Sequence, residues 1–153
     1  MIHWRFAESD IDARALAPLL LIDQYREVGR ARLDPDKAFI SIYTRVKEKR
    51  ACMIFDGETL VGSVGLMKTD YWYSDDPQLV EQWAYVDRRY RGGEAMRCIF
   101  DFARHVAERD GFPAVHMIVF NPQRAKARSP IAHYGEQFGF RPAGAVITIE
   151  AAE

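Results

Sequence analysis

The sequence has 153 residues, with 21 basic and 22 acidic side chains and a formal net charge of −1. A chain of this length is expected to form one domain, residues 1–153, with a sizeable core. The near-neutral charge argues against a general attraction to nucleic acid or membranes, and no apolar run reaches the ~18 residues needed to cross a bilayer.

The start of the chain has no basic region followed by an apolar one, so we predict no secretory signal and expect a cytoplasmic protein. The two cysteines, Cys52 and Cys98, have neither CxxC spacing nor histidines at metal-ligand spacing. We therefore expect reduced core cysteines and no metal site.

The first half of the chain predicts a strand, two helices and a hairpin. Residues 2–7 alternate in polarity as a strand does. A helix is expected over about 10–29, kinked or split by Pro18, and a second helix over 33–50. Two strand-like runs within 51–67 then meet at Asp56-Gly57, a strong hairpin signal.

The second half predicts strand–helix units. A turn-rich connection at 70–78 leads to a strand at 79–86. A helix follows over about 94–110, and its apolar residues recur with helical spacing. We then expect a strand at 114–120, a helix beginning at Pro130 and a last strand at 139–150. The order β-α-α-β-β-β-α-β-α-β predicts an α/β fold, in which a mixed sheet carries helices on both faces.

The junction "YVDRRYRGGEAMRCIFDF" (85–102) joins a strand to a helix, and its linking segment 87–93 has three arginines and two glycines. Free N–H groups and the positive end of the helix dipole meet at such a place. Gly92 and Gly93 would let a ligand approach the backbone closely, so the junction suits a pyrophosphate. It is neither a nucleotide P-loop nor GxGxxG. A tight turn with solvated arginines is the alternative.

This segment resembles the acyl-CoA-binding motif of the GNAT acetyltransferase superfamily, and "IAHYGEQFGFRPAG" resembles that superfamily's C-terminal helix ending in Gly-Phe. The order of elements also matches, so the resemblance spans nearly the whole chain. One departure is Tyr90, which stands where the family signature begins with Gln or Arg.

The resemblance implies acetyl-CoA as co-substrate, bound between splayed strands 79–86 and 114–120. Asn121 would hold the pantetheine arm or cap a turn. Glu94 would repel the pyrophosphate unless it points outward. The backbone is expected to bind the coenzyme at Tyr85 and Val86, beside the thioester, and at the phosphate loop of Arg91, Gly92, Gly93, Glu94, Ala95 and Met96.

The resemblance also implies direct attack by an amine on the thioester. A lysine-like amine has a pKa of about 10.4, so its proton must be removed first. Glu81 is the only carboxylate in strand 79–86 and is the candidate base; water-mediated deprotonation is the alternative. Strict alternation puts Glu81 on the face of Trp83 and Tyr85, but a β-bulge would change that, and the family's acidic position aligns with Gln82.

Tyr134 is the candidate general acid for the leaving thiolate. The family's tyrosine aligns with Gly135, one residue later, which corresponds to about 100° of helix rotation. A half-buried packing role for Tyr134, or His133 as the acid, are the alternatives.

The acceptor is expected to be a primary amine. The acidic and aromatic run "DYWYSDDP" (70–77) would suit a cation bordering the acceptor side; a homodimer surface or a hydrophobic lid is the alternative. We thus expect an N-acetyltransferase. The rival functions are a catalytically silent CoA-binding module and a nucleic-acid contact protein, the latter disfavoured by net charge.

Overall fold

The computed structural model describes residues 1–29, 31–117 and 135–141, and they form a mixed α/β fold as predicted. Its sheet has five strands in sequential order. Neighbours among the first four strands run antiparallel, and the fifth runs parallel to the fourth. The strands are β1 (Ile2–Phe6), β2 (Ala51–Asp56), β3 (Thr59–Tyr71), β4 (Ser74–Val86) and β5 (Val115–His116).

The helical segment after β1 is split at a proline, as the sequence predicts. Ser9 caps α1 (Asp10–Pro18) by accepting a hydrogen bond from the N–H of Asp12. Pro18 has no N–H to donate, and beyond it the chain continues as a π-helical segment, η1 (Leu19–Gln24), and a short α2 (Tyr25–Val28). The predicted second helix is α3 (Pro35–Lys47), which Asp34 caps.

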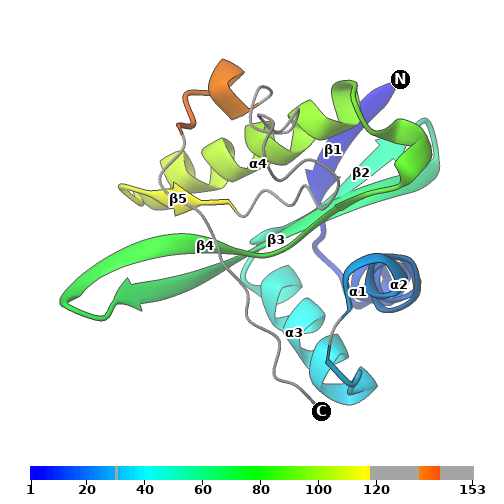
Figure 1. Cartoon of the computed structure of the whole chain (residues 1–153), viewed down its shortest axis with the longest axis horizontal. Coiled ribbons are helices and arrows are strands. Elements are labelled where there is room, and N and C mark those ends of the chain that lie inside the picture. The colour runs from blue at the N-terminus through cyan, green and yellow to red at the C-terminus, as the bar shows by residue number, and fades with distance from the viewer. Residues whose placement is uncertain (30, 118–134, 142–153) are drawn as a thin grey trace, which may run out of the picture.

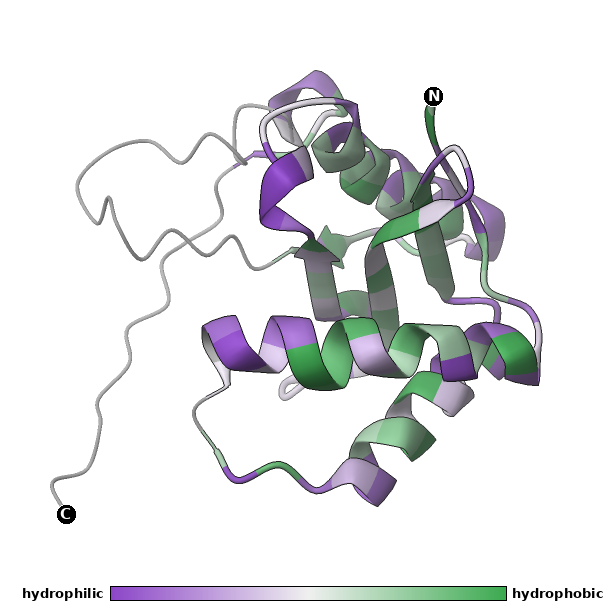
Figure 2. Ribbon diagram, turned by 90° about the vertical axis from the view of Figure 1, so that its right-hand side faces the viewer, coloured by the Kyte–Doolittle hydropathy of each residue, from purple (hydrophilic) through white to green (hydrophobic). Residues whose placement is uncertain are grey.

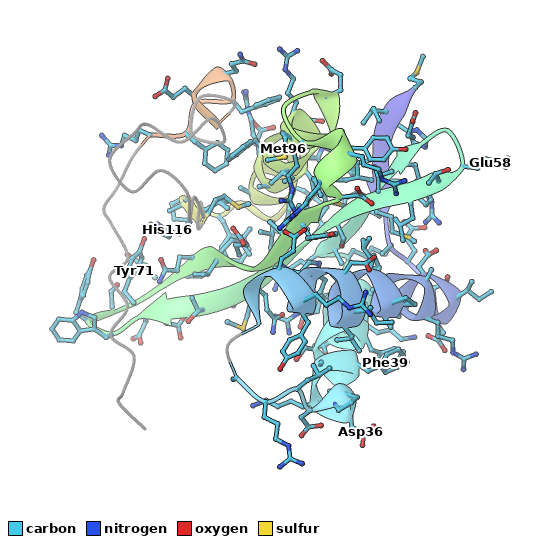
Figure 3. All side chains as sticks on the ribbon, turned by 45° about the vertical axis from the view of Figure 1, so that its right-hand side comes forward. Asp36, Phe39, Glu58, Tyr71, Met96 and His116 are labelled. Carbon is cyan, nitrogen blue, oxygen red and sulfur yellow. The ribbon has the colours of Figure 1, made fainter. Side chains whose placement is uncertain are left out.

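Helices cover both faces of the sheet. The helices α1, α2 and α3 lie on one face, and α4 (Glu94–Asp110) lies on the other (Figure 1). Phe39 of α3 and Met96 of α4 mark these two sides in Figure 3. The strands between the helices are mostly apolar, whereas the helices mix apolar and polar residues along their length (Figure 2).

The predicted apolar stripe of α4 packs into the larger of two cores, together with Cys52, Val64 and Leu66 of the sheet. Phe102 and Val106 are fully buried there. Gly111 ends α4 with a left-handed φ of 71°. The second core joins α1, η1 and α3 to Met53, Trp83 and Tyr85 on the opposite face of the sheet.

The predicted turn-rich connection at 70–78 is wrong, because β3 and β4 continue as a long hairpin almost to its tip. Tyr71 pairs with Ser74, which leaves only Trp72 and Tyr73 in the turn. Pro77 is tolerated because a proline can lie in a strand where its missing N–H faces an unpaired edge, and β5 first meets β4 at Leu79. The hairpin projects beyond the helices (Figure 1).

Three predicted elements near the C-terminus lie wholly or partly outside the described residues. The strand at 114–120 is confirmed at Val115–His116, and residues 118–120 are not described. Helical structure is described at 135–137, before Gly139 with a φ of 86°. The predicted last strand lies outside the description from residue 142 onward.

Candidate active site

The central strand β4 contains a bulge. Gly65 of β3 pairs with Trp83 and the next residue, Leu66, pairs with Glu81, so Gln82 is an extra residue in β4. An extra residue shifts the alternation of side chains beyond it. Glu81 therefore shares the α4 face with Leu66, whereas Trp83 lies in the core on the opposite face.

Beyond the bulge, one edge of β4 points away from β3. The N–H of Asp87 donates to the carbonyl of Val61 in β3 (2.8 Å). Since the peptide groups of a strand alternate in direction, Tyr85 also faces β3, and Ala84 and Val86 face the opposite edge. In the described part of the chain, β5 pairs along that edge only with residues 79–80.

Two side chains reach this open edge from outside the sheet. Gln24 of η1 donates to the carbonyl of Ala84 (3.5 Å), and the Nε of Arg91 donates to the carbonyl of Val86 (2.7 Å). The helical segment after α1 and the loop before α4 thus meet at the same edge. This is the geometry in which a thin, extended ligand can lie along β4.

The open edge leads to the N-terminus of α4. A 3-10 turn, η2 (Arg88–Tyr90), is followed by Gly92 in the left-handed region (φ 88°) and by Gly93 as N-cap. No side chain caps α4, in contrast to α1 and α3. A Cβ added at either glycine would meet nothing within 4 Å. The backbone at this helix start is therefore accessible to a ligand, and an uncapped helix N-terminus suits an anion.

The arginines of this loop are paired with acidic side chains. Glu27 of α2 accepts hydrogen bonds from Arg88 (2.9 Å) and Arg91 (2.7 Å). Asp87 is held by Arg89, which lowers the pKa of its carboxyl group. The side chain of Glu94, which would repel a pyrophosphate unless it points outward, is 65% exposed and pairs with Arg97 at 2.9 Å. The loop therefore offers phosphates mainly its backbone N–H groups.

A small pocket of about 150 Å³ lies on the α3 side of the bulge. Trp83 in this pocket is fixed by a hydrogen bond and by a close fit. Its indole N–H donates to the hydroxyl of Ser63 (2.9 Å), and that hydroxyl donates to the carbonyl of Cys52 (2.8 Å). Gly65 has no side chain and leaves room for the indole ring. The lining residues are Leu20, Leu21 and Gln24 of η1, Ala38, Ser41 and Ile42 of α3, and Gln82 and Trp83 of β4.

Solved structures of acetyltransferases share this architecture. An aminoglycoside acetyltransferase from an uncultured soil metagenomic sample, in complex with sisomicin, matches 99% of this chain and 95% of its own, with 10% identity and a TM-score of 0.64. A ribosomal-protein-alanine N-acetyltransferase from Brucella melitensis matches 99% of both chains (15% identity, TM-score 0.62). An integron cassette protein from a salt-marsh metagenome matches 98% of this chain and 89% of its own (16%, 0.68).

This chain has the GNAT fold. No family model matches the sequence, and no curated protein matches it. The identities of 10–16% support the fold and leave the substrate open. Among the described residues, no helix has the length and apolarity to cross a membrane, and no group of three or more His, Cys, Asp or Glu side chains is arranged to hold a metal ion.

Val86 lies on the open edge of β4 and residues 91–96 form the loop and first turn of α4; their predicted role in binding a coenzyme stays a prediction. Tyr85 does not reach the open edge: its peptide group faces β3, and its side chain is 7% exposed in the core. The guanidinium of Arg91 lies 5.5 Å from its ring centre. Burial, and secondly Glu27, raise the pKa of the Tyr85 phenol, so it stays protonated at neutral pH.

Tyr134, Asn121 and His133 lie outside the described residues, and their predicted roles stay predictions. Gly135, which aligns with the family's tyrosine, is described. A Cβ on Gly135 would stand 3.0 Å from the ring of Phe100, so a larger residue here would have to displace that ring.

The predicted core positions of the two cysteines are confirmed in part. Cys52 is buried and Cys98 is half-buried. Burial raises the pKa of both thiols, to about 11 for Cys98. Both are therefore protonated near neutral pH and are poor nucleophiles.

The acidic and aromatic run at 70–77 does not border the pocket at Gln82. It forms the far end of the hairpin, and residues 74–82 span about 25 Å of strand. Trp72 is 94% exposed there, while Tyr71 contacts His116 of β5 (hydroxyl to Nε2, 3.4 Å; Figure 3). This placement does not support a direct role for the run in binding the acceptor.

Sequence reasoning missed Glu27 and Gln24 at this site. Both come from the helical segment after α1, roughly 60 residues before their partners in β4 and the loop. No local pattern marks such a contact. The only available signal was the number of polar residues near the end of a predicted amphipathic helix.

Proposed function

We propose that this protein is an acyl-CoA-dependent N-acetyltransferase that transfers acetyl from acetyl-CoA to a primary amine by direct attack. The observation that carries the proposal is the continuity of two features. The open edge of the bulged strand β4 runs directly to the uncapped, glycine-initiated N-terminus of α4. Acetyltransferases share this fold.

The pyrophosphate would bind at the start of α4. Backbone N–H groups at the start of α4 and the helix dipole would supply the stabilisation. Arg88 and Arg91 can contribute only by exchanging Glu27 for phosphate, because Glu27 holds both in this structure. Pantetheine would then follow the open edge of β4, where its amides can pair with Ala84 and Val86.

The thioester would lie beside the bulge. The N–H of Ala84 points to the open edge two residues from Gln82 and is the proposed donor to the tetrahedral oxyanion. The N–H of Val86 lies about 13 Å along the strand from the bulge, beside the phosphate loop, and would instead pair with pantetheine. Gln82 lines the pocket on the α3 side, and Glu81 lies on the α4 side. This arrangement favours loss of the amine proton to water over direct transfer to Glu81. Tyr134 remains the proposed acid for the thiolate of CoA.

A panel of primary amines, incubated with acetyl-CoA, tests the proposal by thiol release and by a mass increase of one acetyl group on the acceptor. Turnover on any amine supports it. Binding of acetyl-CoA without thiol release across the panel would favour the rival of a silent CoA-binding module. The second rival, a nucleic-acid contact protein, loses support because the arginines of the loop are paired internally.

A further inference from the structure

Among the residues that the structure describes, the pocket at the bulge has no charged lining residue. Five of its lining side chains are apolar, and the other three, Gln24, Ser41 and Gln82, are neutral and polar. The Ser41 hydroxyl donates to the carbonyl of Lys37 (3.1 Å) and the Gln24 amide to that of Ala84, so two of the three polar side chains already use donors internally. Nothing in this lining compensates a buried cation.

The pocket is open to solvent, and the volume that it encloses suits a small group. About 150 Å³ is the size at which an engineered apolar cavity holds one benzene molecule. Pockets for drug-sized ligands measure about 300–1,000 Å³. An oligosaccharide or a long polyamine would therefore leave most of its body outside.

The position of the pocket connects it to the proposed chemistry. Gln82 is at once the extra residue of the bulge and part of the lining. Gln24, on the opposite wall, contacts the carbonyl of Ala84 at the open edge where the thioester would lie. A group seated between η1 and α3 would thus present its amine toward that edge.

We infer that the acceptor is a primary amine carried on a small apolar body, aliphatic or monocyclic aromatic, and that Leu21 and Gln82 determine this preference. The inference rests on the proposed function. An apolar pocket disfavours the ammonium form and lowers the pKa of a bound amine. The neutral nucleophile is therefore favoured without a carboxylate in the pocket. A second positive charge on the acceptor would only add a desolvation cost.

Transfer then balances without further reactants. The amine nitrogen forms a bond to the thioester carbonyl carbon, and the C–S bond breaks. The amine loses one proton to water, and CoA leaves as the thiol after taking up one proton. The products are an N-substituted acetamide and CoA.

The test compares benzylamine with spermidine as acceptors, using acetyl-CoA and thiol detection. We expect kcat/KM to be at least about tenfold higher for benzylamine. Leu21→Ala should lower the benzylamine value about tenfold, because it removes apolar contact with the ring. Ile22→Ala is the matched control: Ile22 is the next residue of η1, is 47% exposed and does not line the pocket. It should change the value less than about twofold.

A third variant tests the charge argument directly. Gln82→Glu places a carboxylate in the lining and should shift the preference toward spermidine. Preference of the unaltered protein for spermidine, or equal losses in Leu21→Ala and Ile22→Ala, would overturn the inference while the proposed function stands. No thiol release with either amine, and no thermal stabilisation by acetyl-CoA, would overturn the proposed function itself.

Discussion

The carboxylate of Glu27 accepts a hydrogen bond of 2.7 Å from Arg91, a residue 64 positions later in the chain. The same carboxylate also holds Arg88. One acidic side chain of α2 therefore neutralises two arginines of the loop that would receive the coenzyme's phosphates. The loop before α4 and the helical segment beside the pocket are consequently linked through Glu27.

Glu27→Gln should make the loop a better but less selective anion site. With their carboxylate removed, Arg88 and Arg91 become available to phosphates, so the Kd values for acetyl-CoA and for ATP should both fall by about three- to tenfold. The free energy of unfolding should drop by only about 1 kcal/mol, since pairs at the surface contribute little. Titration calorimetry at two salt concentrations measures the change. Unchanged affinity for both ligands would show that the arginines do not face phosphate.

Gly93→Asp should raise the stability of the fold while it weakens the binding of acetyl-CoA. Gly93 is the N-cap of α4, has an extended φ of −141° and has open space around it, so aspartate fits there. Its carboxylate would cap the helix, raise the free energy of unfolding by a few tenths of a kcal/mol and repel phosphate. We expect acetyl-CoA affinity to fall at least about tenfold.

Gly93→Asn is the matched control, because it caps the helix without adding charge. It should weaken binding less than Gly93→Asp does. Equal acetyl-CoA affinity in the aspartate variant and the unaltered protein would contradict the placement of the phosphates at this helix terminus.

Glu81→Gln tests whether this carboxylate is the general base. Because Glu81 lies on the α4 side of the bulge, kcat/KM for the amine should fall by less than about threefold, whereas loss of a true base costs about 10²–10⁴-fold. The pH profile should rise with the fraction of neutral amine in both proteins. A hundredfold loss, together with disappearance of an acidic inflection from the profile, would restore Glu81 as the base.

Asp12 should make stability depend on acid pH. Its carboxylate accepts two hydrogen bonds from Arg5 (2.8 and 2.9 Å), and these, opposed by burial, lower its pKa from 3.8 to about 2. A lowered pKa stabilises the fold above the unfolded-state value, and this stability is lost as the pH falls from about 4 to 2. The contribution should be about 1–2 kcal/mol, because Arg5 is half exposed to solvent.

Urea unfolding of Asp12→Asn and of the unaltered protein measures this dependence. Their stabilities should differ at pH 7 and converge toward pH 2. The control is Asp10→Asn: the carboxylate of Asp10 is exposed and pairs with Lys47 at 3.7 Å, so this variant should show no such convergence. A constant difference across the pH range would contradict the lowered pKa.

Much of the fold could be predicted from local patterns. Period-2 alternation predicted the strand at residues 2–7, and the Asp56-Gly57 pair predicted the first hairpin. The helical spacing of apolar residues predicted which side of α4 is buried. The far end of the β3–β4 hairpin was missed because its aspartates and Pro77 are turn-forming residues. Pairing with β3 overrode that preference, since in the described part of the chain β5 pairs with β4 only at Leu79 and Val80 and leaves the outer side of Pro77 unpaired.

The site was predictable where it depends on backbone and not where it depends on long-range pairing. The glycines and the helix start after β4 were visible as one stretch of sequence. The position of the bulge was not, because it is fixed by which residues of β3 face Glu81 and Trp83. Neither was the neutralising contact of Glu27, which no spacing rule connects to Arg91.

Thermal unfolding with and without acetyl-CoA, with ATP as the control polyanion, tests the central claim most directly. A ligand present at about 100 times its Kd adds about 2.7 kcal/mol to the free energy of unfolding. For a domain of this size the midpoint should then rise by roughly 5–10 °C. A rise with acetyl-CoA and none of that size with ATP is the predicted result. No rise with either ligand would mean that the loop before α4 is only a turn, and it would contradict the proposed coenzyme site.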